Sequence, residues 1–177
     1  NDTDIWTTTT PQGNKYAYPH FVGQSSDTIP WTEKPDGVLY GGGGSEADPY
    51  LIYTYEDLKI MSDLINGTNY ATYRNKHYRL MADIDAAGKT DFVPIGHYAS
   101  DDISFIGVFD GNNKKISNLT ISSATGYSPG LFGHAASGST IKDLAIVGMT
   151  LNASAKARAG AVAGTLGGVV TNVTVLN

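Results

Sequence analysis

The stretch GLFGHAASGSTIKDLAIVG, residues 130–148, decides the fold. Glycine, serine and threonine are too frequent in it for a helix, and the glycines of GLFG would interrupt an ordinary strand. Yet Ile141, Leu144 and Ile146 have the apolar spacing of a strand that changes direction part-way. The stretch therefore predicts short strands that are joined by tight turns containing glycine.

The same pattern occurs three times, which indicates an internal repeat. GVFDGNNKKISNLTIS begins at Gly107 and GAVAGTLGGVVTNVTVLN begins at Gly160, so repeats start near residues 107, 130 and 160. A repeat of this length is typical of a solenoid. Aligned on the first glycine, five positions agree in all copies: Phe109, Phe132 and Val162; Ile116, Ile141 and Val170; Asn118, Asp143 and Asn172; Leu119, Leu144 and Val173; and Ile121, Ile146 and Val175.

Each copy is expected to turn a corner at an Asn or Asp. In a straight strand Ile116 and Leu119 would lie on opposite faces, although both are large and apolar. Asn and Asp are the non-glycine residues that best tolerate the left-handed backbone of a corner. We therefore predict left-handed or bridge angles, and a ladder of stacked side chains, at the structural turn residues Asn118, Asp143 and Asn172.

The fold class that follows is all-β: a right-handed parallel β-helix, which is a solenoid, with a short capping helix. Phe109, Phe132 and Val162 are expected to stack inward from coil to coil, and the polar stretches DGNNKK, HAASGS and TLGG to form loops between faces. The alternative is a β-sandwich with coincidental hairpins. Agreement at five positions in three copies favours the β-helix.

The segment before the repeats predicts one helix and three short strands. Thr54 is the expected N-cap, with Asp57 completing an imperfect capping box, and Gly67 is expected to end the helix. Its apolar stripe is expected to cover one open end of the β-helix core. PYLIY before the helix, HYRLMADI at 77–84 and FVPIG at 92–96 are expected to be strands.

These motifs resemble the GLUG repeat, named for its Gly-Leu-x-Gly signature and found in large bacterial surface and secreted proteins. Residues 130–133 carry that signature, and the segments from residue 46 onward resemble the usual lead-in to such repeats. The third copy departs from it with smaller residues at 161–163. Similar segments precede the protease part of immunoglobulin-A-cleaving metallopeptidases and occur in predicted adhesins. The resemblance implies a module at the cell surface or outside the cell.

The resemblance covers residues 46–177, so the residues before them have to be assigned from their own sequence. Residues 1–40 resemble the tail of a preceding module or an irregular β segment, and 41–45 a glycine linker. The alternative is that 1–40 folds back along the same β-helix. Since NVTVLN at the end carries no cap, the β-helix is expected to continue into further domains of a longer chain.

Composition and motifs argue against several classes of function. The chain has 12 Lys and Arg against 17 Asp and Glu, a net charge of −5, and no cysteine. No basic cluster favours nucleic acid, and no apolar run is long enough for membrane insertion. The sequence contains no complete phosphate-binding loop, calcium loop, H-E-x-x-H or G-x-S-x-G motif. We therefore expect no catalytic residue, metal or cofactor, and no hydrolase or protease activity.

The favoured function is a non-catalytic module of a large secreted or cell-surface protein, acting as an adhesin, a stalk or a ligand-binding scaffold. The partner would be a host or cell-surface glycan or protein. Exposed tyrosines can stack on sugars, and those expected to face a ligand are Tyr53, Tyr55, Tyr73, Tyr98 and Tyr127.

The alternative is a carbohydrate-active enzyme, or its accessory domain, since parallel β-helices can carry catalytic carboxylates. It would use two aspartate pairs: Asp83 with Asp85, and Asp101 with Asp102. We favour a structural role for the first pair, because it lies in the lead-in to the repeats.

Overall fold

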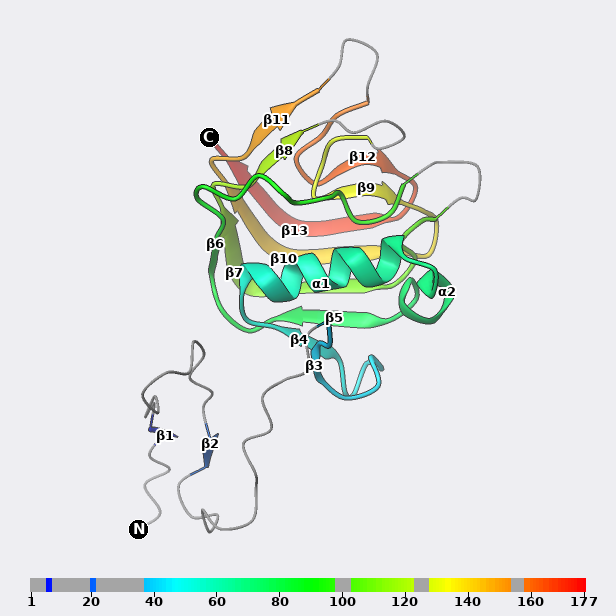
Figure 1. Ribbon diagram of the computed structural model, residues 1–177, viewed down its shortest axis with the longest axis vertical. Helices are drawn as coiled ribbons and strands as arrows, with labels where there is room; N and C mark the ends of the chain where they lie inside the picture. The colour runs from blue at the N-terminus through cyan, green and yellow to red at the C-terminus, as the bar shows by residue number, and fades with distance from the viewer. Residues whose placement is uncertain (1–5, 8–19, 22–36, 98–102, 123–127, 154–157) are drawn as a thin grey trace. The chain divides into compact units, whose positions relative to one another are not determined.

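The structure is a computed structural model that describes residues 6–7, 20–21, 37–97, 103–122, 128–153 and 158–177. The chain divides into two compact units, residues 1–35 and 36–177. The first unit contains an antiparallel pair, β1 (Trp6–Thr7) and β2 (His20–Phe21) (Figure 1). In the described parts of the chain, no helix combines the length and apolar character that crossing a membrane requires.

The second unit is built mostly of strands, with parallel pairing between them. Its largest sheet, called the long sheet below, has seven strands. All their pairings are parallel except that of β3 with β4. The strands run in the order β13 (Val169–Leu176), β10 (Thr140–Val147), β7 (Val108–Ser117), β5 (His77–Leu80), β4 (Tyr50–Ile52) and β3 (Tyr40–Gly41), and β6 (Ile84–Asp85) pairs with the end of β7.

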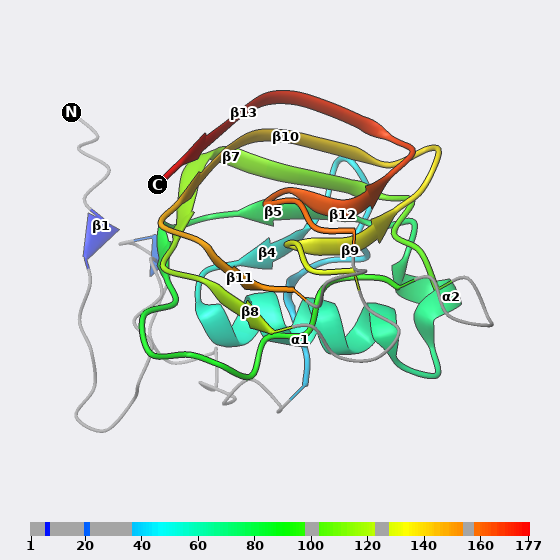
Figure 2. The same ribbon diagram turned by 90° about the horizontal axis from the view of Figure 1, so that it is seen from above.

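Two smaller parallel sheets complete each passage of the chain around the core. One pairs β8 (Thr120–Ser122) with β11 (Thr150–Asn152), and the other pairs β9 (Phe132–Ala135) with β12 (Ala163–Leu166). The chain thus runs β7, β8, β9, then β10, β11, β12, then β13. We call each such passage a circuit, and Figure 2 shows successive circuits lying side by side.

The register within the long sheet corrects the alignment of the first repeat. Between β10 and β13 it is the expected one, since Ile141 pairs with Val170 and Ile146 with Val175. Between β7 and β10, however, Ile141 pairs with Phe109 and not with Ile116. The reason is that Gly107 precedes a strand of the long sheet, whereas Gly130 precedes β9.

The expected inward stack of aromatic residues is wrong for the same reason. Phe109 belongs to β7 and Phe132 to β9, so they face each other from different sheets, with ring centroids 5.5 Å apart. On β12 the residue opposite Phe132 is Ala163, one position later than expected. Of the three polar stretches, DGNNKK lies inside β7, whereas HAASGS and TLGG contain turns between sheets.

The chain turns two different corners, each formed by left-handed residues. Asp143 (φ 54°) and Asn172 (φ 51°) lie at one corner, opposite a bulge in β7 that contains Asn112 and Asn113 (φ 50° and 56°). Asn118 (φ 56°) and Gly148 (φ 60°) lie at the other. These are the angles expected for the corner residues, although Asn118 does not align with Asp143.

Each corner carries a short ladder of side-chain hydrogen bonds. The Asn172 amide donates from Nδ2 to Oδ1 of Asp143 over 2.7 Å, which joins β13 to β10. The Asn118 amide donates from Nδ2 to Oδ1 of Asp85 over 2.8 Å, which joins β7 to β6. The three corner residues were expected to form a single ladder. They instead belong to two ladders, one at each corner.

The left-handed backbone makes Asn118 sensitive to the shape of its side chain. We expect Asn118→Val to lower the free energy of unfolding by about 1–2 kcal/mol, because a β-branched residue is strained at a positive φ. Asn118→Gly keeps the backbone relaxed and removes only the hydrogen bond to Asp85, so its loss should be smaller. Urea titrations of the two variants check this order, which an equal loss in both would contradict.

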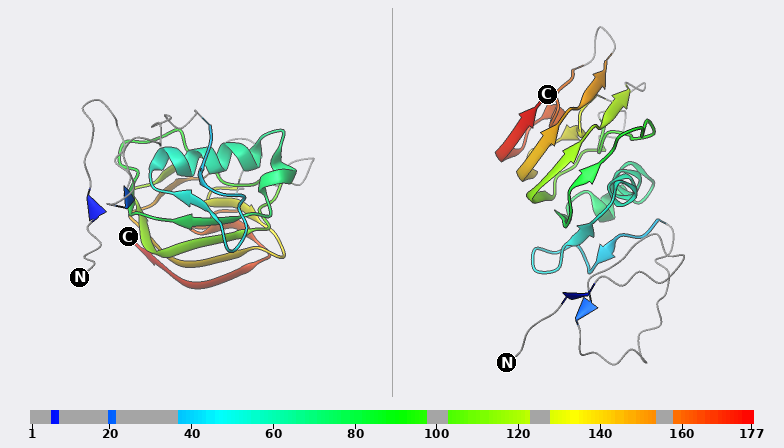
Figure 3. Two further views of the ribbon diagram at one scale, coloured as in Figure 1. Left: turned by 90° about the horizontal axis from the view of Figure 1, so that it is seen from below. Right: turned by 90° about the vertical axis from the view of Figure 1, so that its left-hand side faces the viewer.

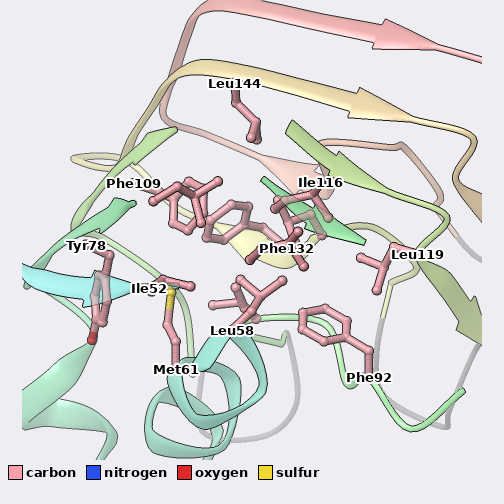
Figure 4. Close-up of a cluster of buried hydrophobic side chains, with 14 of the residues drawn as sticks. Ile52, Leu58, Met61, Tyr78, Phe92, Phe109, Ile116, Leu119, Phe132 and Leu144 are labelled. Carbon is pink, nitrogen blue, oxygen red and sulfur yellow. The ribbon is translucent and has the colours of Figure 1, made fainter. Parts of the chain in front are cut away.

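The interior is a single apolar cluster that runs through all circuits (Figure 4). Phe132 lies at its centre, with its ring centroid 5.0 Å from that of Phe105. The largest side chains without solvent contact include Tyr78, Phe105, Phe109, Phe132, Ile52, Leu58, Met61, Ile65 and Leu80. The inward residues of the last circuit, Val170 and Val173, are only half-buried.

Helix α1 (Tyr55–Asn66) lies at the end of the strand stack formed by β4, away from β13 (Figure 3). It begins as expected, with Thr54 as N-cap and both hydrogen bonds of a capping box to Asp57. Leu58, Met61 and Ile65 face the core. The short helix α2 (Tyr70–Tyr73) follows it and leads to β5.

Two expectations about the segments around the helix are corrected. Residues 92–96 form no strand beyond a single bridge at Ile95, because the side chains of Ser62 and Asn66 bind their backbone. The glycines at 41–44 are not a linker but the start of a hairpin loop between β3 and β4. Asp48 closes this loop, accepting at Oδ2 from the backbone N–H of Gly43.

Candidate functional site

The outer face of the long sheet carries a row of charged side chains. In β5 the side chains of Tyr78 and Leu80 point into the core, so His77 and Arg79 point outward. Arg79 pairs in register with Asp110 on β7, and Asp110 pairs with Lys142 on β10. Three successive strands therefore present a cation, an anion and a cation side by side.

Asp110 holds the two cations in place. Its Oδ2 lies 3.2 Å from a terminal nitrogen of Arg79 and 3.3 Å from Nζ of Lys142. Its Oδ1 accepts from the backbone N–H of Asn112 over 2.8 Å. The Asp110 side chain is only 12% exposed, whereas those of Arg79 and Lys142 are 43% and 35% exposed.

This arrangement keeps Asp110 ionised. Burial raises its pKa, but the hydrogen bond from the Asn112 N–H and the contacts with Lys142 and Arg79 outweigh burial. The net result is a pKa below the ordinary value of 3.8. The carboxylate therefore contributes stability that is fully present above pH 3.8 and is lost as the pH falls through the lower pKa of the folded state.

We accordingly expect the free energy of unfolding to fall as the pH drops below 3.8, and Asp110→Asn to remove about 1 kcal/mol of that dependence. The effect is small because both cations remain partly exposed to solvent, which weakens their interaction with Asp110. Urea titrations of both proteins between pH 2 and pH 7 provide the measurement. Glu46→Gln, at an exposed position of the β3–β4 loop, is the control. Parallel pH profiles for Asp110→Asn and the parent protein would contradict the expectation.

A shallow groove of about 250 Å³ lies over this charged row. The outward residues of β5, β7 and β10 form its floor, and Glu46 and Pro49 of the β3–β4 loop lie at its edge. It combines donors on Arg79 and Lys142 with an acceptor on Glu46, so it suits a small ligand with several hydroxyl groups. The residues that line it are Glu46, Pro49, His77, Tyr78, Arg79, Val108, Asp110, Thr140 and Lys142.

The tyrosines expected to face a ligand do not meet at this groove. Tyr55 is 5% exposed and donates its hydroxyl to Asp91, and burial followed by this bond raises its pKa. Tyr53 packs edge-on against Tyr40, and Tyr73 is half-buried beside Tyr50. These three rings thus contribute to packing. Tyr98 and Tyr127 lie outside the described residues.

The aspartates of the alternative hypothesis are bound to neighbouring backbone and side chains. Asp83 accepts from the backbone N–H of Lys115 over 3.0 Å. Asp85 accepts from Asn118 and from the backbone N–H of Ala87, and these two bonds lower its pKa. Asp101 and Asp102 lie outside the described residues. In the described ranges, no three His, Asp or Glu side chains gather closely enough to hold a metal ion.

Arg79, Asp110 and Lys142 were not predicted as site residues, although the sequence contains a signal for them. Each directly follows an inward residue of the long sheet, so strand alternation places each of them outside. The misaligned first repeat placed Lys142 beside Ser117, whereas in the structure Ser117 pairs with Val147. The correct register brings Lys142 opposite Asp110 and makes the charged row visible.

The chain is similar to parts of two known proteins. No family model matches the chain. It is 33% identical over 145 residues to halomucin from Haloquadratum walsbyi, an alignment that includes 77% of this chain but 2% of halomucin. In structure it resembles a "putative immunoglobulin A1 protease" from Bacteroides ovatus, with a TM-score of 0.59 and 20% identity. That match covers 76% of this chain and 39% of the other, and at this identity it shows the fold alone.

Proposed function

We propose that the chain is a non-catalytic module, a short right-handed parallel β-helix of the GLUG type, in a large secreted or cell-surface protein. It acts there as an adhesin, a stalk or a ligand-binding scaffold. The observation that carries this proposal is the match to halomucin, in which most of this chain corresponds to one small segment of a far longer protein. A segment used in this way fits a structural unit better than a complete enzyme.

The chemistry of the aspartates supports a non-catalytic role. A general acid must hold its proton near neutral pH, which requires a raised pKa. The hydrogen bonds from Asn118 and Ala87 instead lower the pKa of Asp85. Its partner Asp83 binds Lys115, so both carboxylates serve to fasten β6 to β7.

The test is to incubate the purified chain with a panel of polysaccharides, mucin-type glycoproteins and immunoglobulin A1, and to measure both retention and products. We expect any ligand to be recovered intact. A heat-treated sample and the double variant Asp83→Ala/Asp85→Ala serve as controls. Formation of a product that the double variant no longer makes would overturn the proposal in favour of a carbohydrate-active enzyme.

A further inference from the structure

The groove over the charged row is hollow because two rows of outward side chains differ in length. Its floor strands β5, β7 and β10 each pair with a neighbour on both sides, so the floor belongs to the face of the long sheet and not to an edge. Two positions before the charged row, and about 6.6 Å from it along the strands, lies a second outward row. We call it the short row, and the register places its members side by side: His77, Val108 and Thr140. Val108 and Thr140 are much shorter than Arg79 and Lys142, which leaves room above them.

The groove offers apolar carbon at its bottom and its edge. Val108 in the short row and Pro49 in the β3–β4 loop both line it, and both are half-buried, so part of their carbon surface still contacts solvent. A ligand gains free energy by covering such surface. One face of a pyranose ring consists of C–H groups, and that face is suited to cover these two side chains.

The charged row supplies hydrogen-bond donors that are already held in position. Arg79 uses Nε and one terminal nitrogen to bind Oδ2 of Asp110, each over 3.2 Å. A guanidinium carries further N–H groups, and these are left for a ligand. Lys142 is likewise held, since its Nζ lies 3.3 Å from Asp110 and 3.6 Å from Asp143. Binding therefore costs less side-chain entropy than it would with unrestrained side chains.

The charges around the groove balance, which disfavours a charged ligand. Its lining contains the cations Arg79 and Lys142 and the carboxylates Asp110 and Glu46. Asp143 brings a further carboxylate to Lys142. An anionic ligand would therefore find both cations already matched, and the carboxylates would repel it. The hydroxyl groups of an uncharged ligand accept from the cations and donate to Glu46 without this repulsion.

We propose that this groove binds one uncharged pyranose ring of a glycan. The C–H face of the ring lies on Val108 and Pro49. Its hydroxyl groups bind Arg79, Lys142 and Glu46. With a volume of about 250 Å³, the groove is smaller than the ~300–1,000 Å³ typical for drug-sized ligands, so it holds a single ring. The proposal rests on the proposed function, because it gives the ligand-binding scaffold a site and a class of ligand.

Titration with methyl glycosides, followed by NMR of the backbone amides, tests the site. The probes are the methyl glycosides of glucose, galactose and mannose, each compared with its uronic acid form. We expect at least one neutral glycoside to shift the amides of the short row, with a dissociation constant of about 1–10 mM. Its uronic acid form should bind the parent chain at least about threefold more weakly.

Two variants test how the ring is held. Val108→Phe fills the floor and should weaken binding at least about tenfold. Val147→Phe is the matched control, at a half-buried valine of β10 that does not line the groove, and should leave binding unchanged. Asp110→Asn removes the carboxylate that both cations share, so it should reverse the preference and favour the uronic acid form. Circular dichroism checks that each variant is folded.

The outcomes separate this proposal from the proposed function. If no neutral glycoside shifted the amides of the short row at up to about 100 mM, the site would be overturned but the non-catalytic module would not. A parent chain that prefers uronic acid forms, or a folded Val108→Phe variant that binds as well as the parent, would also overturn the site. Cleavage of a glycoside that Val108→Phe abolishes would support the site and contradict only the non-catalytic role.

Discussion

Replacing Phe132 by alanine should lower the free energy of unfolding by about 3–5 kcal/mol. The ring has no solvent contact and lies 5.0 Å from Phe105 and 5.5 Å from Phe109, measured between centroids. It therefore joins β9 to the long sheet across the core, and its loss leaves a cavity that neighbouring backbone cannot fill. Urea unfolding followed by circular dichroism gives the measurement.

The control for Phe132→Ala is Leu166→Ala on β12, in the next circuit, whose side chain is 48% exposed. It should cost less than about 1 kcal/mol, since most of the side chain is already in water. If Phe132→Ala cost no more than this control, the core would not hold the sheets together in the way described.

The second large effect is expected at Gly133, in the Gly-Leu-x-Gly motif. A β-carbon there would collide with the carbonyl oxygen of Gly96, because the two backbones lie in direct contact where Gly133 donates its N–H to Ile95. Gly133→Ala should therefore lower the free energy of unfolding by about 2–3 kcal/mol. The first glycine of the motif is similarly constrained, since a β-carbon on Gly130 would lie 2.5 Å from the carbonyl oxygen of Gly160.

The matched control is Gly43→Ala in the β3–β4 loop, where no atom lies within 4 Å of the added carbon. It should change stability by less than about 0.5 kcal/mol. Thermal unfolding of the two variants and the parent separates the effect of crowding from any general effect of removing a glycine. Equal melting temperatures for both variants would show that the circuits can move apart at no cost.

Local signals in the sequence predicted the local structure well. Thr54 and Asp57 fixed the start of α1 because a capping box depends only on neighbouring residues. Asn118, Asp143 and Asn172 were placed at corners for the same reason, since a left-handed backbone is a property of one residue.

The register and the groove could not be found in this way. A glycine two residues before a phenylalanine occurs both before β7 and before β9, so the motif does not say which sheet follows. The bulge at Asn112 and Asn113 also makes β7 longer than β10, which shifts any alignment made without gaps. Arg79, Asp110 and Lys142 come together only in the true register, which is set by pairing between strands far apart in the sequence. Local signals in the sequence therefore could not predict the charged row.

Helix α1 covers the core at one end of the strand stack, and this affects where the stack can begin to unfold. In an array where each circuit touches only its neighbours, opening begins where a circuit has a neighbour on one side only. Helix α1 closes the β4 end of the core with Leu58, Met61 and Ile65, which are buried. On heating, opening should therefore not begin at the helix end.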